Sequence, residues 1–164
     1  MKTILILRHA KSSWASDTLS DHERPLNSRG ERDAPRMGRL LRDEELLPDL
    51  ILSSSAVRAR TTARLVAEAC GYEGPIEQSR DFYLADASTF IDALSRLSDD
   101  HSRVLVVAHN PGLEELLDEL TGEDETLPTA ALAVVALPVE RWQGLRADGQ
   151  AQLMALWRPR ELTF

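Results

Sequence analysis

The chain has 164 residues, which is enough for one domain with a full hydrophobic core. Its formal net charge of -8 disfavours general binding to nucleic acid, which requires a basic face. The first apolar run is too short for a signal peptide and no later run is long enough to cross a bilayer, so we expect a cytoplasmic protein without membrane contact. The single cysteine, Cys70, excludes an internal disulfide and a cysteine metal cluster, and we expect it to be buried.

The first half of the chain alternates short apolar runs with amphipathic segments. Residues 4–7 and 50–52 are continuous apolar runs of the type that is buried in parallel sheets. Between them, Ser28 and Glu31 predict a capping box that opens a helix ending near Leu46, although Pro35 predicts a later start or a kink. Residues 56–70 predict a second helix, which Gly71 would close.

The second half continues this alternation and then changes to strands. Residues 104–108 predict a third buried strand, and residues 88–97 and 112–120 predict helices on either side of it. Residues 131–137 and 151–157 predict two more strands, with a turn at Asp148 and Gly149. The whole pattern predicts a single α/β domain over residues 1–164: a three-layer sandwich with a mostly parallel sheet, helices on both faces and an antiparallel edge.

Polar residues that suit phosphate chemistry follow three of the predicted strands. Arg8 and His9 follow the first strand, Arg58 follows the second, and His109 and Asn110 follow the strand at residues 104–108. In open α/β sheets, ligands bind beyond the carboxyl ends of the strands. The topology therefore predicts that these side chains meet at one edge of the sheet.

This set of residues is suited to phosphoryl transfer. A neutral imidazole such as His9 can attack phosphorus and form a phosphohistidine, which splits the reaction into two steps. Arg8, Arg58 and His109 would stabilise the charge on the equatorial oxygens, so we expect neither a metal ion nor another cofactor. Each residue alone has an ordinary alternative, because a histidine at a strand end is most often a surface or capping group and an arginine at a helix start is most often solvated.

Three motifs together resemble those of the histidine phosphatase superfamily, also called the phosphoglycerate mutase-like family. Residues 7–10 resemble its "RHG" signature, residues 53–63 resemble "S-x-x-x-R-A-x-x-T-A", and residues 106–110 resemble its histidine after a hydrophobic strand. Residues 8–14 and the "D-x-x-R-P-L-x-x-x-G" element at residues 21–30 are similar to the SixA-type phosphohistidine phosphatases. Ala10 departs from the usual glycine, but alanine is small enough to keep the assignment.

The resemblance implies a role for each matching residue. His9 would be the nucleophile, and Arg8, Arg58 and His109 would form the phosphate pocket. The same pocket would take in Arg24, from the loop after the first strand, and Asn110. Asp81 lies near the position of the superfamily's general acid, but aspartate is shorter than the usual glutamate. A solvated loop carboxylate, or a partner of Arg80, is an equally good interpretation of Asp81.

The function that the resemblance implies is a metal-independent phosphatase acting through a phosphohistidine intermediate. Its expected partner is a protein that carries phosphohistidine. A phosphatase of small phosphate esters is the alternative within the same chemistry, and a mutase is less consistent with so short a chain. A catalytically silent phosphate-binding module is disfavoured because His9, Arg8, Arg58 and His109 are all present.

Overall fold

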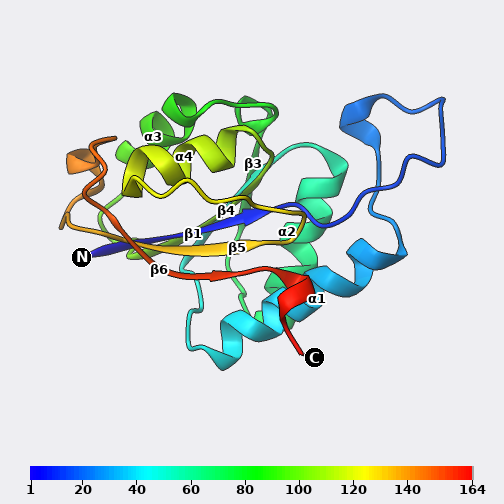
Figure 1. Ribbon diagram of the computed structural model, residues 1–164, viewed down its shortest axis with the longest axis horizontal. Coiled ribbons are helices and arrows are strands. Elements are labelled where there is room, and N and C mark those ends of the chain that lie inside the picture. Colours follow the sequence, from blue (N-terminus) through cyan, green and yellow to red (C-terminus); the bar gives the residue numbers. More distant parts are fainter. Residues whose placement is uncertain (164) are drawn as a thin grey trace.

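The computed structural model describes residues 1–163, which form a single α/β domain around a six-stranded sheet (Figure 1). The strand order is β3-β2-β4-β1-β5-β6. Four neighbouring strands run parallel: β3 (Ile76–Ser79), β2 (Leu50–Ser54), β4 (Arg103–Ala108) and β1 (Lys2–Arg8). The other two are antiparallel to their neighbours: β5 (Leu132–Leu137) and β6 (Gln152–Trp157). The predicted mostly parallel sheet with an antiparallel edge is confirmed.

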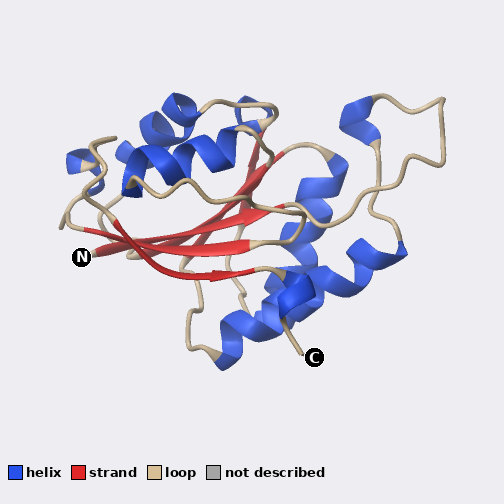
Figure 2. Ribbon diagram, viewed as in Figure 1, coloured by secondary structure: helices blue, strands red, loops and turns tan. Residues whose placement is uncertain are grey.

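Helices cover both faces of the sheet and complete the three predicted layers (Figure 2). The helices on one face are α1 (Ser28–Asp43) and α2 (Val57–Cys70), and those on the other are α3 (Ala87–Ser95) and α4 (Gly112–Thr121). Successive β1 side chains point to opposite faces, so Ile4 packs beneath α3 and α4 while Leu5 packs beneath α1 and α2. Burial on both faces explains why the strand is apolar at every position from Ile4 to Leu7.

The start of α1 differs from the prediction. Asn27, rather than Ser28, is the capping residue: its backbone is extended and its side-chain oxygen accepts a hydrogen bond from the Gly30 amide at 3.0 Å. The helix runs through Pro35 with no delayed start and ends at Asp43, before the predicted end near Leu46. Close packing on α2 supports it, because a Cβ added at Gly38 would lie 2.6 Å from the carbonyl oxygen of Val66.

The remaining elements match their predicted positions to within two residues, apart from one missed strand. Strand β3 is half-exposed at the edge of the sheet, and Ile76 is its only apolar residue, so it has no apolar run from which a strand could be predicted. Gly71 closes α2 with φ of 84°, as predicted, and Cys70 is buried.

Within residues 1–163, four short 3-10 segments lie outside these helices and strands: η1 (Asp21–Glu23), η2 (Arg80–Phe82), η3 (Trp142–Gly144) and η4 (Pro159–Glu161). The first two lie beside the carboxyl ends of the parallel strands and shape the candidate site. Within residues 1–163, no helix has the length and apolar character needed to cross a membrane.

Candidate active site

The predicted strand-end residues meet in one hollow of about 180 Å³. Every predicted site residue except Asp81 lines it: Arg8, His9, Arg24, Arg58, His109 and Asn110. They come together because β1, β2 and β4 are parallel neighbours, so their carboxyl ends lie at the same edge of the sheet. Among the described residues, no aspartate or glutamate lines this hollow.

His9 is held with one ring nitrogen free to act as a nucleophile. Its Nδ1 lies 2.8 Å from the carbonyl oxygen of Ala10, which can only accept, so Nδ1 carries the hydrogen and donates it. Nε2 therefore keeps its lone pair. Burial, aided by the nearby His109, Arg58 and Arg8, lowers the pKa of His9 to about 3, so the ring is neutral at pH 7.

The backbone around His9 is fixed from two sides. The His9 amide donates to the Ala108 carbonyl at 3.0 Å, which joins the ends of β1 and β4. The Ala10 amide donates to Thr62 Oγ1 at 3.0 Å, and that hydroxyl donates to the Arg58 carbonyl at 2.7 Å. The nucleophile and the first turn of α2 are thus tied to each other.

His109 faces His9, with ring centroids 5.1 Å apart. Its Nε2 lies 2.8 Å from Ser54 Oγ, and Ser54 Oγ already accepts from the Ala56 amide, so the serine hydroxyl can donate to Nε2. The ring hydrogen then sits on Nδ1, which is buried and has no partner among the described residues. Burial first, and Arg58 second, lower the pKa of His109 to about 3, so it is a neutral donor.

One edge of the Arg58 guanidinium group is hydrogen-bonded to Asp21. Its Nη2 donates to Asp21 Oδ2 at 2.9 Å and its Nη1 donates to the Asp21 carbonyl at 2.6 Å. Its Nε is buried and has no hydrogen-bond partner within residues 1–163. The edge formed by Nε and the outer hydrogen of Nη2 is therefore available for a forked contact with phosphate oxygens.

Asp21 is a site residue to which sequence reasoning gave no role. Besides Arg58, its carboxylate accepts from Tyr83 Oη at 2.6 Å and from Arg24 Nε at 3.1 Å. The tyrosine hydrogen bond, followed by the contacts with Arg58, holds the pKa of Asp21 well below its usual range. Asp21 therefore stays ionised, which excludes it as a proton donor and suits it to positioning two arginines.

Arg8 and Asn110 are oriented through a shared acceptor. The Leu127 carbonyl accepts from Arg8 Nη1 at 3.1 Å and from Asn110 Nδ2 at 2.7 Å, and the Leu127 amide donates to Glu114 at 2.7 Å. Arg8 Nε and Asn110 Oδ1 are buried without partners. Of five such orphaned side-chain atoms in the described chain, four belong to this site, and three of these four are donors. A hollow with this excess of donors suits a multiply charged oxyanion.

Arg24 lines the hollow and is hydrogen-bonded to the loop that follows β1. Its Nη1 donates to Ser12 Oγ at 2.7 Å and to the Ser13 carbonyl at 3.2 Å, and its guanidinium carbon lies 3.5 Å from the centroid of the Trp14 ring. Only 7% of Arg24 is exposed. These contacts fix the loop after β1 against η1.

Asp81 is not brought to the site. It is exposed on η2 and borders a different surface hollow, together with Thr89 and Arg96. The 3-10 turn directs Tyr83 toward Asp21 and places Leu84 in the lining of the site instead. Asp81 therefore lies near the position of the superfamily's acid in the sequence, but it does not line the phosphate pocket in the structure.

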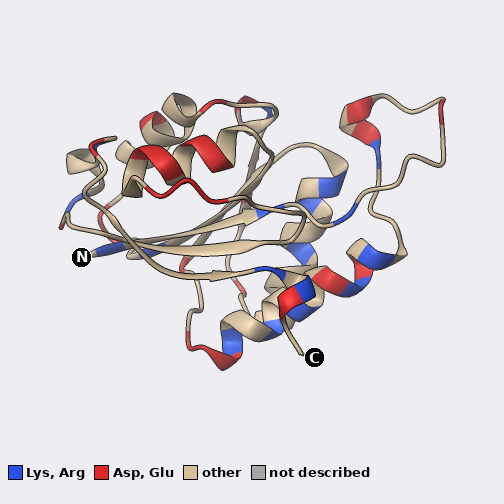
Figure 3. Cartoon of the chain, in the orientation of Figure 1, with Lys and Arg blue, Asp and Glu red and all other residues tan. Residues whose placement is uncertain are grey.

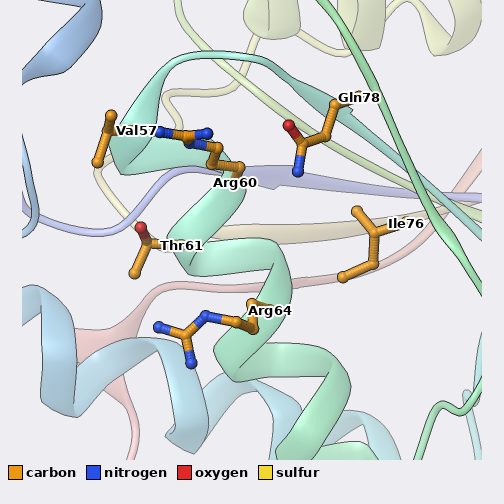
Figure 4. A pocket seen from close by; sticks show the side chains of 6 residues that line it. All are labelled: Val57, Arg60, Thr61, Arg64, Ile76 and Gln78. Atoms are coloured by element: carbon orange, nitrogen blue, oxygen red, sulfur yellow. The ribbon is translucent and has the colours of Figure 1, made fainter.

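A larger hollow of about 360 Å³ lies between α2 and the edge strand β3 (Figure 4). Its lining consists of Val57, Arg60, Thr61, Arg64, Ile76 and Gln78. Among residues 1–163, its lining includes two arginines and the Thr61 hydroxyl but no histidine, cysteine or carboxylate that could act as a general base. The chemistry is concentrated in the smaller hollow at the strand ends.

Comparisons with known proteins agree with this geometry. The profile of the Histidine phosphatase superfamily (branch 1) matches residues 4–83. An uncharacterized protein of Mycobacterium leprae is 33% identical over 167 residues, covering 94% of this chain and 100% of that protein. A crystal structure from Agrobacterium tumefaciens, assigned as the phosphohistidine phosphatase SixA, superposes with a TM-score of 0.82 and 30% identity, covering 96% of this chain and 98% of the other. The structure of the protein histidine phosphatase SixA in complex with tungstate shares the fold, with a TM-score of 0.84 at 24% identity over 98% of this chain and 99% of that one.

The fold, the strand-end site and these similarities place the chain in the histidine phosphatase superfamily. Within that superfamily it is of the SixA type, as its sequence motifs predicted. Membership in this superfamily supports phosphatase activity.

Proposed function

We propose that the protein is a metal-independent phosphatase that uses His9 as its nucleophile and phosphohistidine in another protein as its substrate. The observation that carries the proposal is the pairing of a neutral His9, with Nε2 free, and three orphaned donors in the same hollow. Those donors belong to Arg8, Arg58 and His109. Together they match the needs of nucleophilic attack on a phosphoryl group.

The reaction proceeds in two steps. The His9 Nε2 lone pair forms a bond to phosphorus while the bond from phosphorus to the leaving group breaks with its electron pair. Arg8, Arg58 and His109 donate hydrogen bonds to the phosphoryl oxygens as charge spreads over them. Water then attacks the phosphorylated His9, the bond from phosphorus to nitrogen breaks, and inorganic phosphate leaves with the ring restored.

The choice of substrate follows from the missing acid. No carboxylate among residues 1–163 lines the hollow, Asp81 lies elsewhere, and Asp21 is held ionised. An alkoxide leaving group needs a proton donor, whose contribution is typically about 10²- to 10⁴-fold. An imidazole leaving group is better and needs less assistance. The similarity to an Agrobacterium protein assigned as SixA also supports a phosphohistidine substrate.

A panel of substrates tests the proposal. We expect kcat/KM to be highest for a protein carrying phosphohistidine, lower for an aryl phosphate and lowest for alkyl and sugar phosphates. A sugar or alkyl phosphate as the best substrate would instead identify the protein as a phosphatase of small esters. Absence of turnover on every member, with inorganic phosphate still bound, would identify a silent binding module.

A further inference from the structure

Two large apolar side chains stand exposed at the mouth of the hollow. Trp14 is 73% exposed and Leu84 is 63% exposed, and both line the same hollow as His9. Trp14 comes from the loop after β1 and Leu84 from the segment after η2, so the two approach from separate elements. Large apolar side chains left in water beside a binding site commonly mark a contact with a ligand.

Leu84 is held at the mouth by a strained backbone. Its φ is 56°, in the left-handed region that glycine adopts readily and a bulky side chain does not. The preceding residues account for this conformation, because Phe82 is buried and stacked on Phe90 and Tyr83 is bonded to Asp21. Neighbouring structure therefore fixes a leucine at a position where most of its surface stays exposed, which is the pattern of strain kept at functional positions.

The Trp14 ring packs on the guanidinium group of Arg24. The Arg24 guanidinium lies 3.5 Å from the ring centroid, and Arg24 is itself fixed by Ser12 and Asp21. A buried cation that is anchored by two other groups gives the indole a rigid backing. The high exposure of Trp14 shows that the rest of the ring is uncovered and available for stacking.

We propose that Trp14 and Leu84 form a leaving-group subsite that takes a flat, unsaturated ring carried on the phosphate. This inference rests on the proposed function, since phosphorus must sit among Arg8, Arg58 and His109 for its substituent to reach the mouth. An imidazole or a phenyl ring stacks on an indole face and against a leucine side chain. With no carboxylate in the described lining to bind hydroxyl groups, a sugar finds fewer partners there.

Binding of non-hydrolysable phosphonates tests the subsite without requiring turnover. Phenylphosphonate and cyclohexylphosphonate have rings of similar size, but only the first is flat, and methylphosphonate has no ring. We expect calorimetry on the intact protein to show phenylphosphonate binding roughly 3- to 10-fold more tightly than either of the others, as expected for one ring stack.

Variants at the two positions separate the subsite from the phosphate pocket. Trp14→Ala should weaken phenylphosphonate roughly 3- to 10-fold and inorganic phosphate by less than about 2-fold, while Trp14→Phe should retain most of the affinity. Leu84→Gly relieves the left-handed strain, so it should keep the fold and lose part of the preference for the flat ring. Leu47→Gly is the matched control, because this exposed leucine precedes β2 at the opposite end of the parallel strands and should change no affinity.

The outcomes are distinguishable. Equal affinity for phenylphosphonate and cyclohexylphosphonate, or unchanged phenylphosphonate affinity in both Trp14→Ala and Leu84→Gly, would overturn the subsite and leave the phosphate site intact. Failure of inorganic phosphate and of all three phosphonates to bind would overturn the phosphate site itself, and the subsite with it.

Discussion

Asp21 is the residue on which the orientation of the candidate site depends. Its carboxylate and carbonyl occupy the terminal nitrogens of Arg58, and its second carboxylate oxygen holds Arg24. Arg58 is only 4% exposed, so its charge would be costly to bury without this partner. The side chain of Asp21 is hydrogen-bonded to Arg24, Arg58 and Tyr83 rather than to His9. It therefore acts through the arginines, as a positioning residue.

Asp21→Asn should lower kcat/KM for an aryl phosphate roughly 10- to 100-fold, because the amide keeps the shape but loses the charge-assisted bonds. Affinity for inorganic phosphate should fall in parallel, since Arg58 would no longer present its Nε edge. Asp81→Asn is the matched control and should stay within about twofold of wild type, because that carboxylate lies outside the hollow. The reverse ranking of the two variants would restore Asp81 as the acid and contradict a positioning role for Asp21.

Both site histidines should remain neutral well below their ordinary pKa. Burial lowers the pKa of His9 and of His109 to about 3, whereas an unfolded chain has histidine pKa values of about 6.5. We expect NMR signals of both rings, assigned with His9→Ala and His109→Ala, to show no titration above about pH 5. Titration of either ring near pH 6.5 in phosphate-free buffer would refute the neutral nucleophile.

The same pKa values set the sign of a stability change. Between about pH 6.5 and 3 the unfolded chain binds protons at these histidines that the folded chain does not. The free energy of unfolding should therefore rise with pH across this window. The stability that the two neutral histidines contribute should be lost as the pH falls from about 6.5 to about 3.

At the scale of elements, the first turn of α1 is packed directly on the loop that follows His9. A Cβ added at Gly30 would collide with the carbonyl oxygen of Lys11, and the same carbonyl accepts a hydrogen bond from the Asn27 amide at 3.0 Å. Since backbone cannot move aside as a flexible side chain can, Gly30 is needed for this close approach.

Gly30→Ala should reduce the free energy of unfolding by roughly 1–3 kcal/mol, the usual range for overpacking, and should also lower turnover by displacing the loop. Urea denaturation and an aryl phosphate assay measure the two effects. Gly144→Ala provides the control, because its added Cβ would meet only the Val139 side chain, at ordinary distances of 3.6 Å to Cγ1 and 3.9 Å to Cβ. Equal stability of the two variants would contradict the tight contact between α1 and the loop.

The elements that could be predicted from the sequence are those that bury whole faces. Strand β1 could be predicted from its continuous apolar run, and helix α2 from its amphipathic pattern and the closing Gly71. Strand β3 was missed because an edge strand needs few apolar residues, and the cap of α1 was misassigned because Asn27 and Ser28 are both good capping residues.

The candidate site likewise contains residues that the sequence predicts and residues whose role depends on contacts between distant parts of the chain. His9, Arg58 and His109 could be predicted because each follows a strand and parallel strands share an edge. The role of Asp21 depends on contacts with Arg58 and Tyr83, which are 37 and 62 positions away in the chain, and local sequence carries no signal for such contacts. Asp81 is the opposite case, since its position in the chain is suggestive but η2 places it on the border of a different surface hollow.

At the scale of the whole molecule, charge is distributed unevenly. Acidic residues gather along α4 and the segment after it, whereas arginines lie on α2 (Figure 3). The protein carries a net charge of -8, yet its strand-end hollow is lined by Arg8, Arg24 and Arg58. These arginines therefore attract an anionic substrate at the hollow, although the net charge of the whole protein is negative.

Because these arginines supply the positive charge, activity should survive chelation. We expect kcat/KM in excess EDTA to stay within about twofold of the untreated value, since guanidinium groups replace the usual role of a metal in neutralising phosphoryl oxygens. Loss of activity that a divalent cation restores would contradict the metal-independent mechanism.

The most direct test of the whole account is the identity of the phosphorylated residue during turnover. Rapid quenching of the enzyme with an aryl phosphate, into base rather than acid because phosphohistidine is acid-labile, followed by peptide mass spectrometry, reads it out. We expect a transient phosphoryl group on His9, absent in His9→Ala, whose kcat/KM should fall more than about 10³-fold. A phosphoryl group on another residue, or turnover by His9→Ala near the wild-type rate, would contradict nucleophilic catalysis by His9.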